Sequence, residues 1–146
     1  MTVANTCNRS VVYIDENAYI NEVAEMMREK HVGSVVVVDK AGKPIGIITD
    51  RDLVIEILAE EVPPEKVALK DIMTTDLIVI NESDDISNAV EKMRNKAVRR
   101  APVVDQEGLL SGILSVDDVL TDLRSEINDI IALIKKSRIK ESKRRK

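Results

Sequence analysis

The chain has 146 residues, a formal net charge of −4, one cysteine, one histidine and no tryptophan or phenylalanine. A chain of this length can form one domain or two small units that share an interface. One cysteine excludes an internal disulfide, and a single cysteine with a single histidine argues against a zinc site or a Cys–His nucleophile.

Residues 1–10 lack the basic and apolar regions of a secretion signal, and no apolar run is long enough to span a bilayer. We therefore expect a soluble, cytoplasmic protein that has no membrane partner. The lone Cys7 agrees with this expectation, since an unpaired thiol suits a reducing compartment.

Residues 11–58 predict a strand, a helix, two strands and a second helix, in that order. The strands are expected at 11–14, 35–38 and 45–48, and apolar residues recur at helical spacing over 20–32 and again from 50. The strand at 35–38 is apolar on both faces, so we expect it to lie buried between layers. This half of the chain therefore predicts one βαββα unit.

An ungapped shift of 66 residues superimposes residues 12–57 on 78–123 with many identities, so the same βαββα pattern occurs twice. Neither unit is large enough to cover its own sheet. We predict an α/β (α+β) fold in which two tandem repeats pack sheet to sheet about a pseudo-twofold axis. The expected boundaries are 1–62 for the first repeat, 63–70 for the linker, 71–124 for the second repeat and 125–146 for a C-terminal helix extension with a basic tail.

The helix pattern of the second repeat continues over residues 119–139 with an apolar stripe that could cap the core or pair with another subunit. Most of the final residues are basic: Lys135, Lys136, Arg138, Lys140, Lys143, Arg144, Arg145 and Lys146. They could contact nucleic acid or another anionic partner. We favour a solvated, disordered end instead.

Both repeats place a hydroxyl and an acidic residue where a strand ends and a helix begins, as Thr49 and Asp52 and as Ser115 and Asp118. A carboxylate and a hydroxyl at such a place can hold a ribose or a phosphate. The same spacing is also that of a helix N-cap with a capping-box partner, which needs no ligand. Taken alone, the motif favours the cap.

The two repeats contain the segments VVVVD at 35–39, APVVD at 101–105, GIITDRD at 46–52, GILSVDD at 112–118 and the lead-in KDIMT at 70–74. Together they resemble a cystathionine-β-synthase (CBS) domain pair over most of residues 10–124. The first copy departs from the pattern with Asn5-Thr6-Cys7-Asn8 in place of that lead-in. We therefore expect one of the two pockets to differ in shape.

The resemblance implies two clefts between the repeats, each holding an adenine nucleotide, with AMP expected and ADP or ATP as alternatives. The first cleft would use Thr49, Arg51 and Asp52 with Asp76–Ile78. The second would use Ser115, Asp117 and Asp118 with Ser10–Val12. The base would be lined by four apolar residues: Ile47, Ile113, Val32 and Val98.

The two clefts differ in charge, because Arg51 corresponds to Asp117 in the second repeat. Arg99 and Arg100 replace Gly33 and Ser34 and are expected to contact phosphate in the second cleft. The alternative is that they are surface arginines paired with neighbouring acids. We expect unequal affinity, with one site dominant.

We interpret the chain as a regulatory ligand-sensing module with no catalytic residues and no metal site. The resemblance also implies a homodimer and an unidentified regulated protein. The alternative is an interaction protein whose clefts are vestigial and whose basic tail engages nucleic acid or protein. An enzyme fragment is a third reading, although nothing in the sequence supplies a catalytic domain, and His31 is expected at a helix end rather than in a site.

Overall fold

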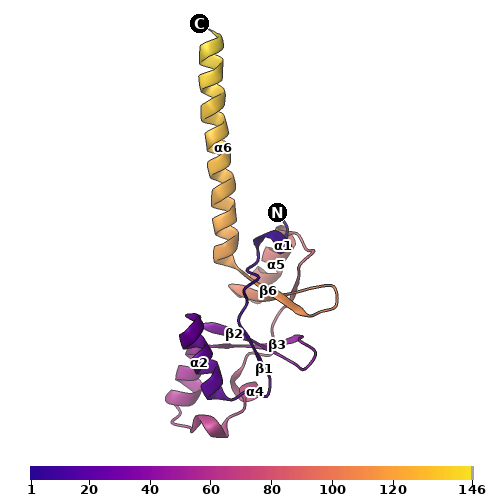
Figure 1. The fold of residues 1–146 in the computed structure, drawn as a ribbon, viewed down its shortest axis with the longest axis vertical. Coiled ribbons are helices and arrows are strands. Elements are labelled where there is room, and N and C mark those ends of the chain that lie inside the picture. The colour runs from indigo at the N-terminus through magenta and orange to yellow at the C-terminus, as the bar shows by residue number, and fades with distance from the viewer. Residues whose placement is uncertain (146) are drawn as a thin grey trace.

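The computed structural model describes residues 1–145 and contains two three-stranded sheets (Figure 1). The first sheet has the order β1 (Tyr13–Asp15), β2 (Ser34–Val38), β3 (Pro44–Thr49), and the second has β4 (Ile80–Asn81), β5 (Arg100–Val104), β6 (Leu110–Ser115). In each sheet the first two strands are parallel and the last two form an antiparallel hairpin. The predicted pair of βαββα units is confirmed.

The helices are α1 (Val3–Thr6), α2 (Ile20–Lys30), α3 (Asp50–Leu53), the π-helical turn η1 (Val54–Leu58), the 3-10 turn η2 (Pro64–Lys66), α4 (Leu69–Ile72), α5 (Ile86–Lys96) and α6 (Val116–Arg144). Helices α1 and α2 of the first repeat correspond to α4 and α5, and the start of α6 corresponds to α3 and η1. Helix α6 projects well beyond the two sheets (Figure 1). The expectation of a disordered basic end was wrong, because α6 continues to Arg144 through strong helix formers without glycine or proline.

Helices α2 and α5 end in the same unusual way. His31 follows α2 with φ 55° and Ala97 follows α5 with φ 56°, so both residues adopt the left-handed conformation. Glycine is the usual residue at this position, because a Cβ atom makes the conformation costly. The sharp reversal brings the chain directly into β2 or β5.

Strand β2 is buried on both faces, as its apolar sequence predicts. Val35 and Val37 belong to the core of the first repeat, whereas Val36 is only 1% exposed on the opposite face. Pro102, the equivalent of Val36 in β5, is also fully buried and lies outside the core of its own repeat. These residues therefore lie between the two sheets, which pack face to face.

Two short helices, α1 and α4, lead into the first and second repeats. Each of these lead-in helices packs on the repeat that it does not precede. Thr74, after α4, exchanges backbone hydrogen bonds of 2.8 and 3.0 Å with Ile47 in β3. Asn8, after α1, does the same with Ile113 in β6 at 2.9 and 3.0 Å. The N-terminal segment thus packs on the second sheet, and the segment that precedes the second repeat packs on the first.

Apolar side chains reinforce this exchange of lead-ins. Val3 and Cys7 belong to the core of the second repeat. Leu69 and Met73 lie in or against the core of the first. Boundaries drawn along the chain therefore do not coincide with the units that pack together.

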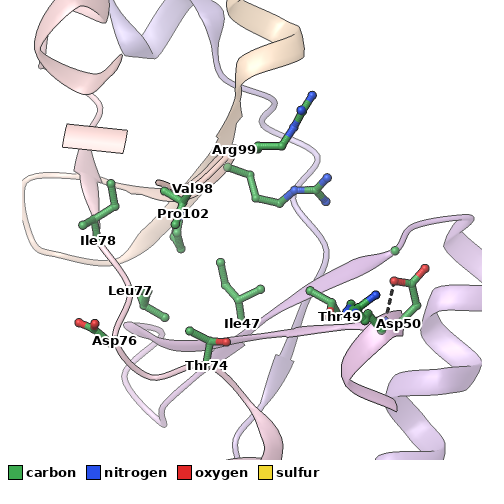
Figure 2. Close-up of a pocket in the computed structure, with 13 residues that line it drawn as sticks. Ile47, Thr49, Asp50, Thr74, Asp76, Leu77, Ile78, Val98, Arg99 and Pro102 are labelled. Carbon is green, nitrogen blue, oxygen red and sulfur yellow. Dashed lines mark hydrogen bonds between the residues drawn. The ribbon is translucent and has the colours of Figure 1, made fainter. Parts of the chain in front are cut away.

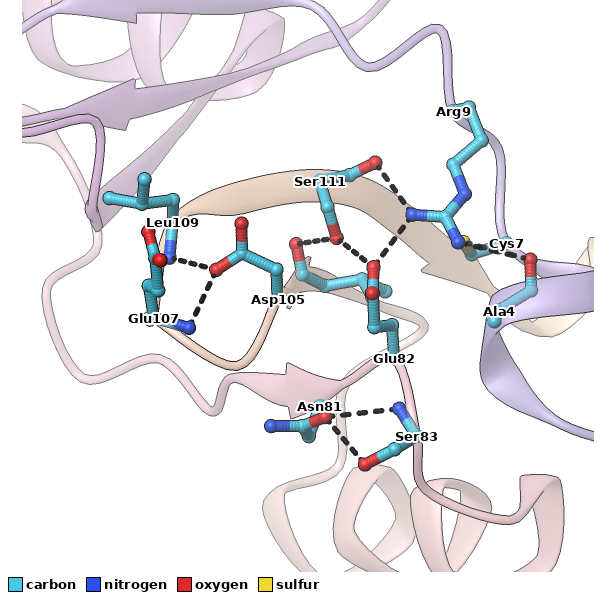
Figure 3. Close-up of polar contacts among 11 residues, drawn as sticks. Ala4, Cys7, Arg9, Asn81, Glu82, Ser83, Asp105, Glu107, Leu109 and Ser111 are labelled. Carbon is cyan, nitrogen blue, oxygen red and sulfur yellow. Dashed lines mark hydrogen bonds and ion pairs between the residues drawn. The ribbon is translucent and has the colours of Figure 1, made fainter.

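Arg9 adds a polar connection between the N-terminal segment and the second sheet (Figure 3). Its guanidinium donates to Glu82 Oε2 at 2.8 Å, and the Ser111 hydroxyl donates to the same oxygen at 2.9 Å. The hydrogen bond from Arg9 is the main reason why the pKa of Glu82 lies below its usual value. The first repeat has no such connection, because Thr75 stands at the position equivalent to Arg9.

Candidate ligand-binding clefts

A cleft of about 550 Å³ opens between the end of β3 and the segment that leads into β4 (Figure 2). Its apolar lining consists of Ile47, Leu77, Ile78, Val98 and Pro102. Its polar lining consists of Thr49, Asp50, Arg51, Thr74, Asp76, Arg99 and Arg100. We call it the first cleft, since it contains the strand end of the first repeat.

The equivalent second cleft is smaller, at about 250 Å³. It lies between the end of β6 and the segment that leads into β1. Its lining residues include Ser10, Val11, Val12, Val32, Ser34, Arg100, Ile113, Ser115, Asp117 and Asp118. Both clefts therefore draw residues from both repeats, as the resemblance implied.

Fifteen of the sixteen candidate residues line one or both of these two clefts. Asp52 is the exception, because it does not line the first cleft. Its carboxylate turns back and accepts from the Thr49 backbone N–H at 2.9 Å, while the Asp52 N–H donates to Thr49 Oγ1 at 3.1 Å. The capping-box reading of the motif is therefore present in the first repeat.

The second repeat keeps only half of that arrangement. The Asp118 backbone N–H donates to Ser115 Oγ at 3.1 Å, so the hydroxyl caps α6. Asp118 itself lines the second cleft. The two acidic residues of the motif thus occupy different surroundings despite their equivalent positions in the sequence.

Arg99 lines the first cleft and Arg100 lines both clefts, whereas the sequence interpretation assigned both arginines to the second. Arg100 donates to Ser34 Oγ at 2.8 Å, while Arg99 Nη2 lies 3.7 Å from Asp117 Oδ1. The reason is that this position lies between the clefts, as Gly33 of the first repeat also lines both. A long side chain at this position, such as Arg99 of the second repeat, can therefore line the cleft at the strand end of the first repeat.

The clefts consequently carry opposite charge. Three arginines line the first cleft together with Asp50 and Asp76, and Asp76 is paired with Lys96 at 2.8 Å. The second cleft holds one arginine against Asp117 and Asp118. An anionic group is electrostatically favoured in the first cleft and disfavoured in the second.

The glycines of the two GI motifs are required by close packing behind the clefts. A Cβ at Gly46 would lie 2.5 Å from Met73 Sδ, and a Cβ at Gly112 would lie 3.0 Å from both Cys7 Sγ and the Asn8 carbonyl oxygen. Burial raises the pKa of the Cys7 thiol, so Cys7 is a neutral, apolar counterpart of Met73. The departure of the first lead-in from KDIMT therefore preserves its packing role.

Sequence reasoning missed several residues at the clefts. Asp50, Thr74 and Pro102 line the first cleft, and Asn8 and Ser34 line the second. The lead-in residues could have been found by extending the 66-residue shift backwards, which matches Val3 with Leu69 and Cys7 with Met73. Asp50 has no such signal in the sequence; its backbone N–H donates to the Gly33 carbonyl oxygen at 2.9 Å.

Within residues 1–145, no group of three or more His, Cys, Asp or Glu side chains is arranged to hold a metal ion. None of the helices in this range is both long enough and apolar enough to cross a membrane. His31 ends α2 and does not line either cleft.

The curated relatives include an uncharacterized protein of Methanopyrus kandleri that is 38% identical over 120 residues, which are 82% of this chain and 61% of the relative. The chain thus spans about three fifths of that protein. A solved CBS domain pair in complex with 5′-methylthioadenosine and S-adenosyl-L-methionine matches with a TM-score of 0.73 and 25% identity, covering 86% of this chain and 98% of that one. A structure named CBSX2, in complex with AMP, matches in fold with a TM-score of 0.70 and 24% identity, covering 85% and 96%.

The family model for the CBS domain matches twice, at residues 3–59 and at 69–125. Each match begins at a lead-in helix and extends through the third strand of a sheet, the first to just after η1 and the second into α6. The two matches together cover most of the chain and coincide with the two repeats. The chain therefore belongs to the CBS domain family and contains a tandem pair of these domains.

Proposed function

We propose that the chain is a regulatory module that binds an adenosine ligand, with AMP as the expected ligand, in the first cleft. The observation that carries this proposal is the combination in one cleft of about 550 Å³ of an apolar wall and three arginines. That volume lies within the range of small-molecule sites, whereas the second cleft, at about 250 Å³, falls below it.

The apolar wall suits the base. Ile47, Val98 and Pro102 offer aliphatic surface, and no aromatic side chain lines the cleft. A purine held in this way gains its affinity from burial and from backbone hydrogen bonds rather than from stacking. This part of the ligand is shared by AMP, ADP, ATP and methylthioadenosine.

The ribose is proposed to lie at the end of β3. Thr49 lines the cleft there, and its hydroxyl accepts one hydrogen bond from Asp52 while keeping its own proton available. Asp52 uses only its Oδ2 atom in the bond from Thr49, so the second carboxylate oxygen can accept from a ribose hydroxyl after a small side-chain rotation.

The arginines provide the selectivity for phosphate. Arg51, Arg99 and Arg100 approach the cleft from both repeats, and guanidinium groups hold phosphate by paired hydrogen bonds. The acidic second cleft is instead suited to a neutral or cationic adenosyl compound, such as those named for one of the structural neighbours. We therefore propose unequal sites, with the first dominant for AMP.

Because residues of both repeats line the first cleft, a bound ligand favours one angle between the repeats over others. This coupling is the proposed signal to a regulated protein. A homodimer, a cytoplasmic location and the absence of catalysis are parts of the same proposal. The alternative function as an interaction protein gives no role to the three arginines that line the first cleft.

The test is calorimetric titration and thermal unfolding of the chain with AMP, ADP, ATP, methylthioadenosine and S-adenosyl-L-methionine. We expect AMP to raise the unfolding midpoint, and Asp52→Ala to reduce that rise more than Asp118→Ala. Since Asp52 also caps a helix, the rise is measured against each variant's own ligand-free midpoint. If none of the five compounds changes the midpoint, or if titration finds two equal sites for AMP, the proposal fails.

A further inference from the structure

The outer part of α6 carries a long apolar stripe that nothing within residues 1–145 covers. Every residue from 123 to 145 is exposed, and α6 projects away from both sheets (Figure 1). The exposed large apolar residues of this helix are Leu120, Leu123, Ile127, Ile130, Ile131, Leu133, Ile134 and Ile139. A continuous apolar surface of this kind usually marks an interaction site.

The spacing of the stripe indicates what kind of surface would cover it. Leu120, Leu123, Ile127, Ile130 and Ile134 are separated by three, four, three and four residues. This alternation keeps one narrow seam on the helix and is the pattern that packs against another helix as knobs into holes. The covering surface is therefore expected to be a second helix with a similar seam.

The charges of α6 are divided along its length. Residues 117–129 contain five acidic side chains and one arginine, whereas residues 135–145 contain seven basic side chains and one glutamate. Two copies of α6 side by side in parallel would place like charges together. In an antiparallel pair the acidic part of each helix lies beside the basic part of the other.

We propose that α6 pairs with α6 of a second copy of this chain in an antiparallel arrangement. In the register that buries the most apolar layers, Leu123 faces Ile134 of the partner subunit and Ile127 faces Ile130 of the partner subunit. The same register sets the acidic residues among 117–122 level with the basic residues among 135–140 of the partner subunit. This pairing is independent of ligand binding in the clefts.

The first experiment measures self-association of the full chain by sedimentation equilibrium over a range of concentrations. The double variant Ile127→Ser/Ile134→Ser removes two seam positions. The matched control, Ala132→Ser/Ile139→Ser, has the same spacing of seven residues on the opposite side of the helix. We expect the seam variant to raise the dissociation constant about a hundredfold or more and the control to change it by less than about threefold.

The second experiment determines the orientation by disulfide crosslinking. Leu123→Cys and Ile134→Cys are prepared separately with different tags. The wild-type chain, whose one cysteine is the buried Cys7, measures the background crosslinking. Antiparallel pairing predicts a crosslinked heterodimer in the mixture and little self-crosslinking of either variant. Self-crosslinking of each variant alone would show parallel helices and overturn the proposal.

A wild-type chain that remains monomeric at all concentrations would overturn it as well, and so would a seam variant that associates like wild type. AMP titration of the seam variant separates the two proposals. Loss of association with unchanged AMP affinity supports the helix pairing whatever the clefts bind, and failure of AMP binding leaves the association data unaffected.

Discussion

The two clefts share a backbone and differ in side chains. Each is formed by the end of one repeat's hairpin and the entry strand segment of the other, yet one is about 550 Å³ and rich in arginine while the other is about 250 Å³ and acidic. The exchange of Arg51 for Asp117 and of Gly33 for Arg99 accounts for most of the charge difference. A duplicated fold thus provides two positions for a ligand, and a few substitutions decide which ligand suits each one.

The largest expected effect is a loss of stability when the core side chains of the lead-in helices α1 and α4 are truncated. Leu69 is 1% exposed in the core of the first repeat, so Leu69→Ala should lower the free energy of unfolding by about 2–5 kcal/mol. Val3→Ala, the equivalent change in the core of the second repeat, removes fewer atoms and should cost about 2 kcal/mol. Urea unfolding measures both losses.

Hydrogen exchange then locates each effect. Leu69→Ala should speed exchange in α2 of the first repeat, and Val3→Ala should speed exchange in α5 of the second. Leu58→Ala, at a side chain that is 71% exposed, is the control and should change the stability by less than about 0.5 kcal/mol. Faster exchange in the repeat that follows each lead-in along the chain would contradict the crossed packing.

The next effect concerns the charge of the first cleft. Arg51→Ala should weaken AMP binding by about 10- to 100-fold, because a hydrogen bond to a charged group contributes about 1.5–3 kcal/mol. Methylthioadenosine has no phosphate and should lose less than about threefold in affinity. Calorimetric titration gives both values.

Asp117→Ala is the matched variant, since Asp117 is the equivalent residue in the second repeat. It releases Arg99 from an exposed ion pair of 3.7 Å and should leave AMP affinity equal or slightly higher. Equal losses in Arg51→Ala and Asp117→Ala would show that the two clefts are used alike.

A smaller effect distinguishes the ends of α2 and α5. Ala97→Gly should stabilise the protein by about 0.5–1 kcal/mol, because alanine with φ 56° has a strain that glycine lacks. His31→Gly should gain less, since histidine enters the left-handed region more readily than alanine. Thermal unfolding of the two variants checks the order, and a destabilised Ala97→Gly would contradict the assigned strain.

The smallest effect is the pH dependence of the Arg9–Glu82 connection. The pKa of Glu82 is lowered in the folded chain, so its contribution is present above the unfolded pKa and is lost as the pH falls through the folded value. Glu82→Gln should therefore lower stability near pH 7 and lose its effect under acidic conditions. Glu16→Gln, the equivalent change in the first repeat, should show a smaller change at neutral pH, since Thr75 stands in place of the arginine.

Much of the architecture was predictable because it depends on periodicity. The 66-residue repeat and the buried strand at 35–38 follow from apolar spacing and from glycine turns, which are local properties. The candidate cleft residues were implied by the resemblance to the CBS family. The reach of Arg99 and Arg100 was not predictable in this way. Their alignment with Gly33 and Ser34 was correct, but the cleft that each side chain lines depends on its conformation and on its contacts with Asp117 and Ser34.

The sequence by itself determined the duplication, the order of elements in each repeat and the unequal charge of corresponding residues. Only the tertiary structure decided that α1 packs on the second repeat and α4 on the first, that Asp52 turns back to cap its helix, and that α6 stands away from the cores. The physical reason is that these features depend on contacts between residues far apart in the chain. The two sheets have equivalent strand orders, and only the tertiary structure shows on which of them each lead-in packs.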